Sequence, residues 1–267
     1  MKKHCDFVPL AAQSECKKAA SKSWCMVFLL SSVFLAPLHL RATSIVALVD
    51  DMEHRLVIAA DCRVLRGSGP ASDCKIIVEP GCVVAVAGLY QEAGAGFKLR
   101  QLVRAACQEP GDLRSKAEAF VRISRKPYER AVRSIREKQP ADFAQTVANK
   151  PTEVVFAGIQ DGRVALMVRG LEADLAGRIR VERYESIAPS YPRTGYFLGL
   201  NGHIRAYVRA HPDWVREDYA AAAHRFVEME IAAHPDLAGP PISELEIDQY
   251  GHVHWLDKGM CNIRESD

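Results

Sequence analysis

Residues 43–61 read TSIVALVDDMEHRLVIAAD, two runs of mostly aliphatic residues separated by the charged segment 50–54. Apolar runs of this length, joined by a short polar segment, are typical of a β-hairpin. The second run ends at Asp61, and a third apolar run begins directly after Lys75. The pattern therefore predicts that the Thr43 hydroxyl, the Asp61 carboxylate and the Lys75 ammonium all stand at strand ends.

A threonine at the first position of a mature chain is able to act as a nucleophile. Its own free α-amine accepts the proton of the side-chain hydroxyl, so the residue carries its own base. Thr43 has this property only if residues 1–42 are removed. The nature of this first segment therefore decides whether the chain is an enzyme of this kind.

The first 42 residues differ in composition from the rest of the chain. Five lysines precede the thirteen-residue apolar run 24–36, and the segment closes on Ala42. A basic region, a short apolar core and a small residue form the pattern of a secretory signal peptide, and a transmembrane helix needs about 20 apolar residues. We predict that residues 1–42 are a leader, either a signal peptide or a propeptide, whose removal leaves Thr43 first. An uncleaved membrane anchor is the alternative.

The composition excludes several classes of protein. Of the 267 residues, 48% are hydrophobic and 25% are charged, which is ordinary for a globular protein with a sizeable core. The formal charge of +2 gives no reason to expect nucleic acid or an anionic membrane surface as a partner. The eight cysteines include no CxxC pair, so a structural zinc site is not predicted. Removal of the leader leaves five cysteines, so at least one is unpaired or bonded to another chain.

The remainder of the chain alternates between strand and helix patterns without an internal linker or repeat. The predicted elements are a strand at 82–88, a helix at 97–107, a helix from 112, strands at 153–159, 163–168, 178–184 and 195–198, a helix through 204–208, a helix at 217–233, and strands at 242–247 and 252–256. Pro127 is expected to kink or end the second helix. This order predicts one α+β domain in which two sheets pack face to face, with a helix layer outside each.

Four segments match a known family in order and nearly in spacing. They are residues 43–47 (TSIVA), residues 58–61 (IAAD), Lys75 and residues 87–88 (AG). In these segments the chain resembles the β-type subunits of the proteasome and the related subunit of the bacterial two-tier ATP-dependent protease. Both belong to the N-terminal nucleophile (Ntn) hydrolases. The resemblance implies a four-layer αββα sandwich over residues 43–267.

The resemblance implies a role for each matched residue. Thr43 is expected to be the nucleophile and its α-amine the base, while the charge of Lys75 favours the alkoxide-like state of the hydroxyl. Asp61 is expected to hold Lys75 in place, and the Gly88 N–H to stabilise the oxyanion. Taken singly, each residue also has an ordinary structural explanation. Thr43 is a strand former, Asp61 and Lys75 are a surface ion pair, and Gly88 ends a strand.

The chain departs from the family where two supporting serines are expected. The family has a Gly-Ser-Gly turn before the third helix, and an aspartate with a serine after the fourth. Here residues 199–202 read GLNG and residues 234–239 read HPDLAG, which leaves Asn201 and Asp236 as the candidate supporting residues. Because these serines support the threonine amine and its water, their absence bears on activity rather than on the fold.

The family's specificity pocket is built at three further positions. Cys62, Val86 and Tyr90 occupy them here, which implies a modest apolar pocket for uncharged side chains. Cys62 and Cys74 either form a disulfide across neighbouring strands or remain as two buried thiols.

No cofactor or metal is predicted. His252 and His254 alternate along one strand face, but two histidines on a strand are more often a solvated face than a metal site.

The sequence thus predicts a threonine-type peptidase or amidohydrolase that acts on peptides or small amides. A small-amide Ntn amidase and a catalytically silent subunit of a proteasome-like ring are the alternatives. The expected partners are copies of the same chain in a ring, without nucleic acid, and with a membrane only if the leader is uncleaved. A signal peptide implies export to the periplasm or the extracellular space, whereas a propeptide implies the cytoplasm.

Overall fold

The stretch at residues 43–61 forms the hairpin that the sequence predicts. Strand β1 (Ser44–Asp50) pairs antiparallel with strand β2 (Arg55–Asp61). Every residue of β1 is buried, and its side chains alternate between two apolar clusters, with Ile45 on one side of the sheet and Val46 on the other. Because both faces of the strand are covered, its sequence is continuously apolar.

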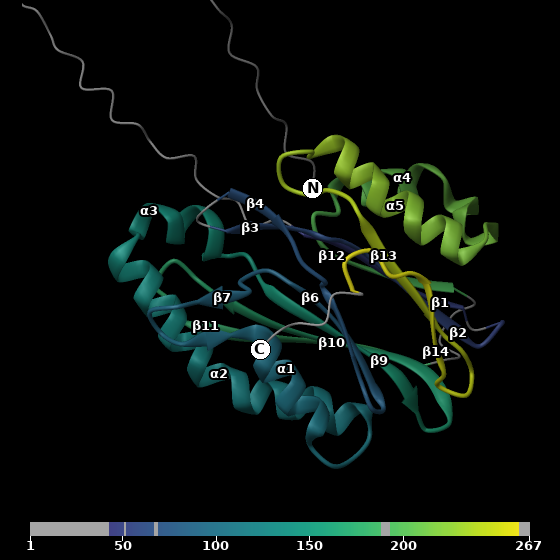
Figure 1. Ribbon diagram of the computed structural model, residues 1–267, viewed down its shortest axis with the longest axis horizontal. Helices are drawn as coiled ribbons and strands as arrows, with labels where there is room; N and C mark the ends of the chain where they lie inside the picture. The colour runs from purple at the N-terminus through teal and green to yellow at the C-terminus, as the bar shows by residue number, and fades with distance from the viewer. Residues whose placement is uncertain (1–42, 51, 67–68, 188–192, 262–267) are drawn as a thin grey trace, which may run out of the picture. The chain divides into compact units, whose positions relative to one another are not determined.

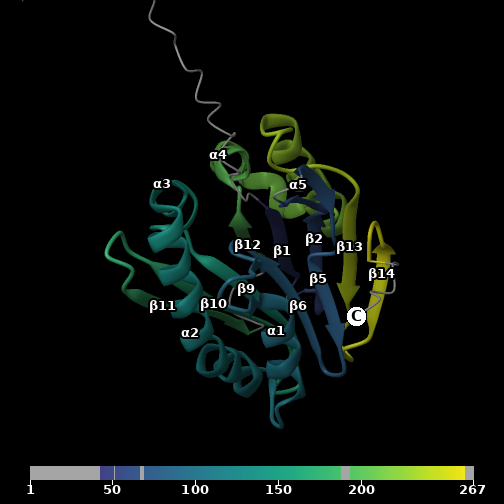
Figure 2. The same cartoon turned by 60° about the vertical axis from the view of Figure 1, so that its left-hand side comes forward.

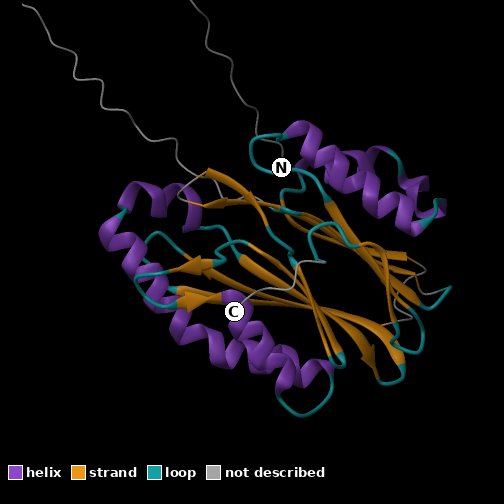
Figure 3. Ribbon diagram, in the orientation of Figure 1, coloured by secondary structure: helices purple, strands orange, loops and turns teal. Residues whose placement is uncertain are grey.

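The computed structural model describes residues 43–261 except 51, 67–68 and 188–192 (Figure 1). The predicted leader, residues 1–42, lies outside the described residues. The described part is a mixed α+β structure with two five-stranded antiparallel sheets, as predicted at the level of fold class (Figure 3). Within these residues, no helix has both the length and the apolar character needed to cross a membrane.

Strands β1 and β2 lie inside the first sheet, whose strand order is β12-β1-β2-β13-β14. Its other members are β12 (Arg193–Gly199), β13 (Ile242–Ile247) and β14 (Val253–Asp257). Strand β12 pairs with β1 so that Gly199 lies opposite Ser44. The beginning of β1 is therefore placed beside the end of β12.

The second sheet has the strand order β11-β10-β9-β6-β5. Its strands are β5 (Ile76–Glu79), β6 (Cys82–Ala87), β9 (Thr152–Gln160), β10 (Arg163–Ala173) and β11 (Ile179–Ile187). Two short hairpins complete the strands described: β3 (Arg63–Arg66) with β4 (Gly69–Ser72), and β7 (Gln91–Glu92) with β8 (Phe97–Lys98).

The helices pack on the two sheets in two separate groups (Figure 2). They are α1 (Leu99–Gln108), α2 (Leu113–Lys138), α3 (Pro140–Asp142) with the π-helical turn Phe143–Val147, α4 (Gly202–Ala210), the 3-10 turn Pro212–Arg216, and α5 (Tyr219–Ala233). Helices α1 and α2 share an apolar cluster with the second sheet, and α4 and α5 share another with the first. A third cluster contains side chains of both sheets.

Of the two effects expected of Pro127, a kink or the end of the helix, helix α2 excludes the end. The helix continues through Pro127 for 26 residues in all. Buried side chains on both sides of the proline, Phe120 before it and Tyr128 after it, hold the helix against the second sheet. This burial outweighs the backbone hydrogen bond that proline removes. The Asp112 carboxylate caps the start of α2 by accepting the Ser115 N–H at 2.8 Å.

The cysteines pair differently from the disulfide considered for Cys62 and Cys74. Cys74 is bonded to Cys261, and Cys82 is bonded to Cys107. Cys62 is the free cysteine of the described residues and is fully buried, with its Sγ 3.1 Å from the Ser243 hydroxyl. Both alternatives for Cys62 and Cys74, a shared disulfide and two thiols, were therefore wrong, because Cys62 is a thiol whereas Cys74 is bonded to Cys261. The odd cysteine expected after leader removal is Cys62.

Candidate functional site

A cavity of about 430 Å³ brings three of the predicted site residues together. Thr43, Gly88 and Asn201 are all among the residues that line it. They come from the start of β1, the end of β6 and the turn between β12 and α4. The segment 146–153, which runs into the first residues of β9, also lines the cavity. The cavity therefore collects residues that are far apart in sequence around the proposed nucleophile.

Thr43 is held firmly at the cavity wall. Its side chain and backbone are only 8% exposed, and its carbonyl accepts the Leu200 N–H at 2.7 Å. Gly199, with φ +67°, passes so close that an added Cβ would lie 2.0 Å from the Thr43 carbonyl oxygen. Only glycine allows this approach. The segment that departs from the family's Gly-Ser-Gly turn thus still fixes the position of Thr43.

Asp61 and Lys75 form a buried ion pair next to this position. The Lys75 Nζ lies 2.7 Å from Asp61 Oδ1, and the side chains are 2% and 0% exposed. The same oxygen accepts the N–H of Ser44 at 2.8 Å. The other carboxylate oxygen accepts the N–H of Arg63 at 3.1 Å and of Gly239 at 3.2 Å. Asp61 therefore joins Lys75 to the residue that follows Thr43.

Burial changes the acid–base behaviour of Lys75. Loss of water lowers the pKa of the Lys75 ammonium below its ordinary value, and the negative charge of Asp61 opposes this shift. A buried ammonium is costly unless a carboxylate accompanies it, and Asp61 meets this need. The pair places a positive charge, weakly screened by water, close to the start of β1.

Gly88 follows β6 at the cavity wall in a conformation that excludes side chains. Its φ is +99°, and an added Cβ would lie 2.7 Å from the Thr152 Cα and 2.8 Å from the Pro151 carbonyl oxygen. The next residue, Leu89, donates its N–H to the Thr152 hydroxyl at 3.0 Å. Gly88 therefore contributes backbone without a side chain to the cavity wall.

The two candidate supporting residues lie in different surroundings. Asn201 lines the cavity, donates to the Phe197 carbonyl at 2.9 Å and accepts from Arg205 at 2.9 Å. Asp236 is exposed in the loop after α5, and it is the neighbouring Leu237 that lines the cavity. Asn201 is thus brought to Thr43, whereas Asp236 is not among the lining residues.

The three residues predicted for a specificity pocket are not among those that line this cavity. Cys62 is buried against Ser243, and Val86 belongs to the cluster shared with α1 and α2. Tyr90 packs against the same cluster and accepts a hydrogen bond from Arg100 at 3.4 Å. The cavity beside Thr43 is lined by other residues, among them residues 149–153.

Glu153 is the cavity residue that sequence reasoning missed. Its carboxylate accepts the Gly199 N–H at 3.3 Å and the Tyr196 hydroxyl at 3.4 Å. Burial raises the pKa of Glu153, and burial together with the Glu153 charge raises the pKa of Tyr196 to about 12. The available signal was a carboxylate at the start of the otherwise apolar run 153–159.

Two side-chain groups among the described residues have the composition of a metal site. One is His203 with Glu230 and His234. The other joins Asp248 to His252 and His254, the two histidines that alternate along β14 and the turn before it. In the second group the Asp248 carboxylate also caps its turn, accepting the N–H groups of Tyr250 and His252.

Comparison with known proteins assigns no family. The chain matches no protein-family model, and no curated protein matches it.

Proposed function

We propose that this chain is a threonine-type amide or peptide hydrolase in which Thr43, freed by removal of residues 1–42, is the nucleophile. The observation that carries the proposal is the buried Asp61–Lys75 pair, in which Asp61 accepts the N–H of Ser44, the residue directly after the cavity-lining Thr43. An ion pair of this kind is costly to bury, so its presence needs an explanation. An electrostatic effect on the Thr43 hydroxyl provides one.

The proposal includes the finer description of the fold as the four-layer αββα sandwich of the Ntn hydrolases. Support comes from the two antiparallel sheets that share one apolar cluster, and from the helix pairs α1–α2 and α4–α5 that cover one sheet each. Further support comes from the four matched segments, which lie at the start of β1, at the end of β2, directly before β5 and at the end of β6.

The reaction begins when the Thr43 Oγ attacks the carbonyl carbon of the substrate amide. The α-amine takes the hydroxyl proton, directly or through a water, and a C–O bond forms while the carbonyl π electrons move to oxygen. The protonated amine then gives its proton to the leaving nitrogen as the C–N bond breaks. Water attacks the resulting ester by the same route, which releases the acid and restores Thr43.

The surrounding residues stabilise this sequence electrostatically. The Lys75 charge favours the developing alkoxide and lowers the proton affinity of the α-amine, which keeps a useful fraction of the amine neutral. Asp61 orients Lys75 and bonds the Ser44 N–H, which sets the direction of the chain at Thr43. The Gly88 backbone stabilises the negative oxygen of the tetrahedral intermediate.

Two observations keep the other functions in view. A cavity of about 430 Å³ has the size of a small-molecule site, which favours the small-amide amidase. The Asn201 amide, engaged with Phe197 and Arg205, stands where the family has a serine, which favours a silent ring subunit. The two disulfides suit an exported protein, in agreement with the predicted signal peptide.

The decisive experiment combines intact-mass spectrometry with amide and peptide reporter substrates. The purified chain is expected to begin at Thr43, and Thr43→Ala is expected to abolish hydrolysis at a cost of about 1 kcal/mol or less of stability. Thr43→Ser is the matched control, because it keeps a hydroxyl and an α-amine. A mature chain that retains Ala42, or a Thr43→Ala variant with wild-type turnover, contradicts the proposal.

A further inference from the structure

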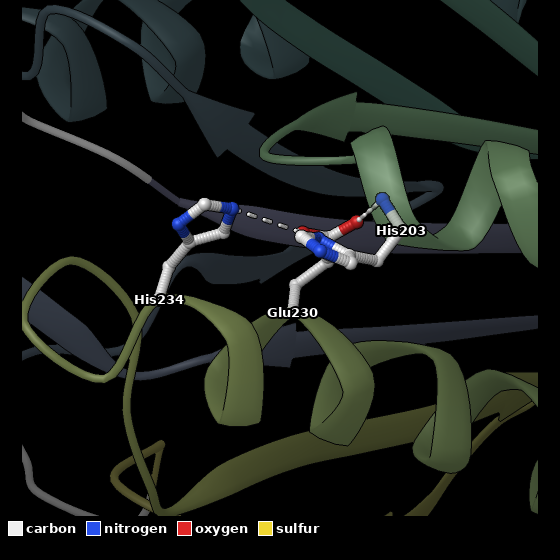
Figure 4. A group of neighbouring side chains, drawn as sticks. All are labelled: His203, Glu230 and His234. Carbon is white, nitrogen blue, oxygen red and sulfur yellow. Dashed lines mark hydrogen bonds and ion pairs between the residues drawn. The ribbon is translucent and has the colours of Figure 1, made fainter.

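Two histidines and a buried glutamate meet where α4 begins and α5 ends. His203 lies in the first turn of α4, Glu230 lies in the last turn of α5, and His234 follows that helix directly (Figure 4). Their ligand atoms all lie within 4.8 Å of one another. We propose that these three side chains bind a divalent transition-metal ion of the zinc class. The prediction from sequence was that the chain holds no metal.

Glu230 has the burial and the bonding of a ligand held in position. Its side chain is 0% exposed. One carboxylate oxygen, Oε1, accepts the N–H groups of His203 at 2.8 Å and Ile204 at 3.0 Å, and so caps α4. The other oxygen, Oε2, faces the two imidazole rings. The backbone of α4 thus fixes the carboxylate and leaves one oxygen directed toward the histidines.

One contact at Oε2 is a long hydrogen bond, and the distances of both imidazole nitrogens from Oε2 are close to the spacing of ligands around one ion. His203 Nδ1 lies 3.4 Å and His234 Nε2 lies 3.8 Å from Glu230 Oε2. Strong charge-assisted hydrogen bonds are shorter, about 2.7–2.9 Å. Around tetrahedral zinc, bonds of about 2.0–2.2 Å place neighbouring ligand atoms roughly 3.3–3.5 Å apart. Small side-chain rotations therefore bring the three atoms around one ion.

The donor set selects the class of ion. Two imidazoles and one carboxylate suit zinc and its neighbours in the transition series, whereas calcium and magnesium prefer oxygen ligands throughout. The His203 and His234 side chains are 56% and 36% exposed, so the ion has a route from solvent and room for water as a further ligand. Three protein ligands with an open position form a familiar zinc arrangement.

The proposed ion joins two segments that form the walls of the cavity. His203 follows Asn201, a lining residue, by two positions, and His234 precedes Leu237, another lining residue, by three. The loop after His234 continues to Gly239, whose N–H bonds Asp61. A bound ion would therefore tie the turn that holds Thr43 to the loop that holds Asp61. This inference concerns metal binding and stands independently of the proposed hydrolase activity.

The second group, around Asp248, has a simpler explanation. The Asp248 carboxylate already bonds the His252 imidazole at 2.9 Å, a full hydrogen bond, and caps the turn that it begins. Its histidines are 69% and 59% exposed at the surface. We therefore use it as a control in the experiment.

The test is zinc binding to the purified chain after removal of metal with a chelator. Calorimetric titration with Zn²⁺ is expected to give one equivalent per chain, and Co²⁺ is expected to give the visible absorption of a low-symmetry, non-octahedral site. His203→Gln and His234→Gln are each expected to weaken zinc binding by more than about 100-fold, since residues that merely orient ligands are worth about 10–100-fold. Zinc is also expected to raise the Tm of the wild type but not of these variants.

His224→Gln and His252→Gln are the matched controls. His224 lies on α5 and pairs with Glu244 at 3.2 Å, away from the proposed site. His224→Gln is therefore expected to leave zinc binding unchanged. Glu230→Gln keeps one carbonyl oxygen for the α4 cap but removes the anionic ligand. This variant is therefore expected to fold but not to bind zinc. If that variant does not fold, zinc binding by His203→Gln and His234→Gln still decides the question. Zinc binding that is absent in the wild type, unaffected in His203→Gln and His234→Gln, or lost in His252→Gln overturns the proposal.

Discussion

Asp61 and Lys75 form a 2.7 Å ion pair from which solvent is almost completely excluded, and Asp61 also bonds the amide of Ser44. Three backbone N–H groups hold the Asp61 carboxylate besides Lys75. The carboxylate is therefore fixed even without its cation, which makes Lys75 the partner to change. The function of the ammonium can be tested without leaving the carboxylate wholly unbonded.

Lys75→Met is expected to lower the hydrolysis rate by about 100-fold or more, because the positive charge no longer favours the alkoxide. It is expected to reduce stability by at most about 3–5 kcal/mol, the cost of stranding a buried charge. The measurements are reporter hydrolysis and a melting curve on the same sample, starting from an active wild type.

Arg169→Met provides the matched control for that variant. Arg169 is fully buried and pairs with Glu118 and Glu185, and none of these three residues lines the cavity. Its removal is expected to destabilise the protein while the folded fraction retains its turnover. Near-wild-type turnover of folded Lys75→Met would assign the Asp61–Lys75 pair a purely structural role.

Gly88→Ala is expected to reduce both stability and activity. The methyl group would collide with the Thr152 and Pro151 backbone at a positive φ, at a cost of at least about 1–3 kcal/mol. Gly81→Ala is the control, because Gly81 has φ +68° but no atom within 4 Å of the added Cβ. Denaturant unfolding and hydrolysis are compared for the two. Equal losses in both variants would mean that backbone strain alone, and not the cavity wall, is responsible.

Glu153→Gln is expected to change how stability depends on pH. Burial raises the folded-state pKa of Glu153 above its ordinary 4.5, so the folded chain binds more protons than the unfolded chain in the interval above that value. The wild type therefore loses stability as pH rises from about 4.5 through the raised pKa, and the variant lacks this loss. Across this pH interval, the Tm of the variant is expected to rise relative to the Tm of the wild type. Parallel curves would contradict the prediction.

Cys74→Ala combined with Cys261→Ala is expected to reduce stability by about 2–5 kcal/mol, the usual effect of losing a native disulfide. Because Cys74 precedes Lys75, the activity is expected to fall as well. The pair Cys82→Ala with Cys107→Ala is the comparison, since that bond joins β6 to α1 and not to the C-terminal segment. Activity relative to folded protein is the deciding measurement. Equal activity in the two double variants would show that the Cys74–Cys261 bond does not position Lys75.

Sequence patterns predicted the strands well because burial on both faces makes them continuously apolar. The hairpin at residues 43–61 and the strands β6, β9 and β10 are confirmed on this ground. Pro127 does not end α2, because the tertiary burial of Phe120 and Tyr128 holds the helix on both sides of the proline, and local propensity does not include such burial. The cysteine pairing was beyond prediction, since Cys74 meets a partner 187 positions away only after folding.

The site was predictable where a motif carries the chemistry in a short stretch. Thr43, Gly88 and Asn201 were named from sequence and do line one cavity. Glu153 was not named, because its strand pattern is apolar and the approach of Gly199 cannot be read from spacing. Glu230 and His234 share a helical spacing, but His203 joins them only through the packing of α4 on α5.

Thr43 and the wall beside it are synthesised at different times. Ser44 lies opposite Gly199, and the Leu200 N–H bonds the Thr43 carbonyl, so the cavity depends on residues that leave the ribosome long after Thr43. Pairing between such distant segments is slow to form. A nascent chain therefore carries Thr43 before the cavity around it is complete, because the residues near Gly199 and Leu200 are synthesised later.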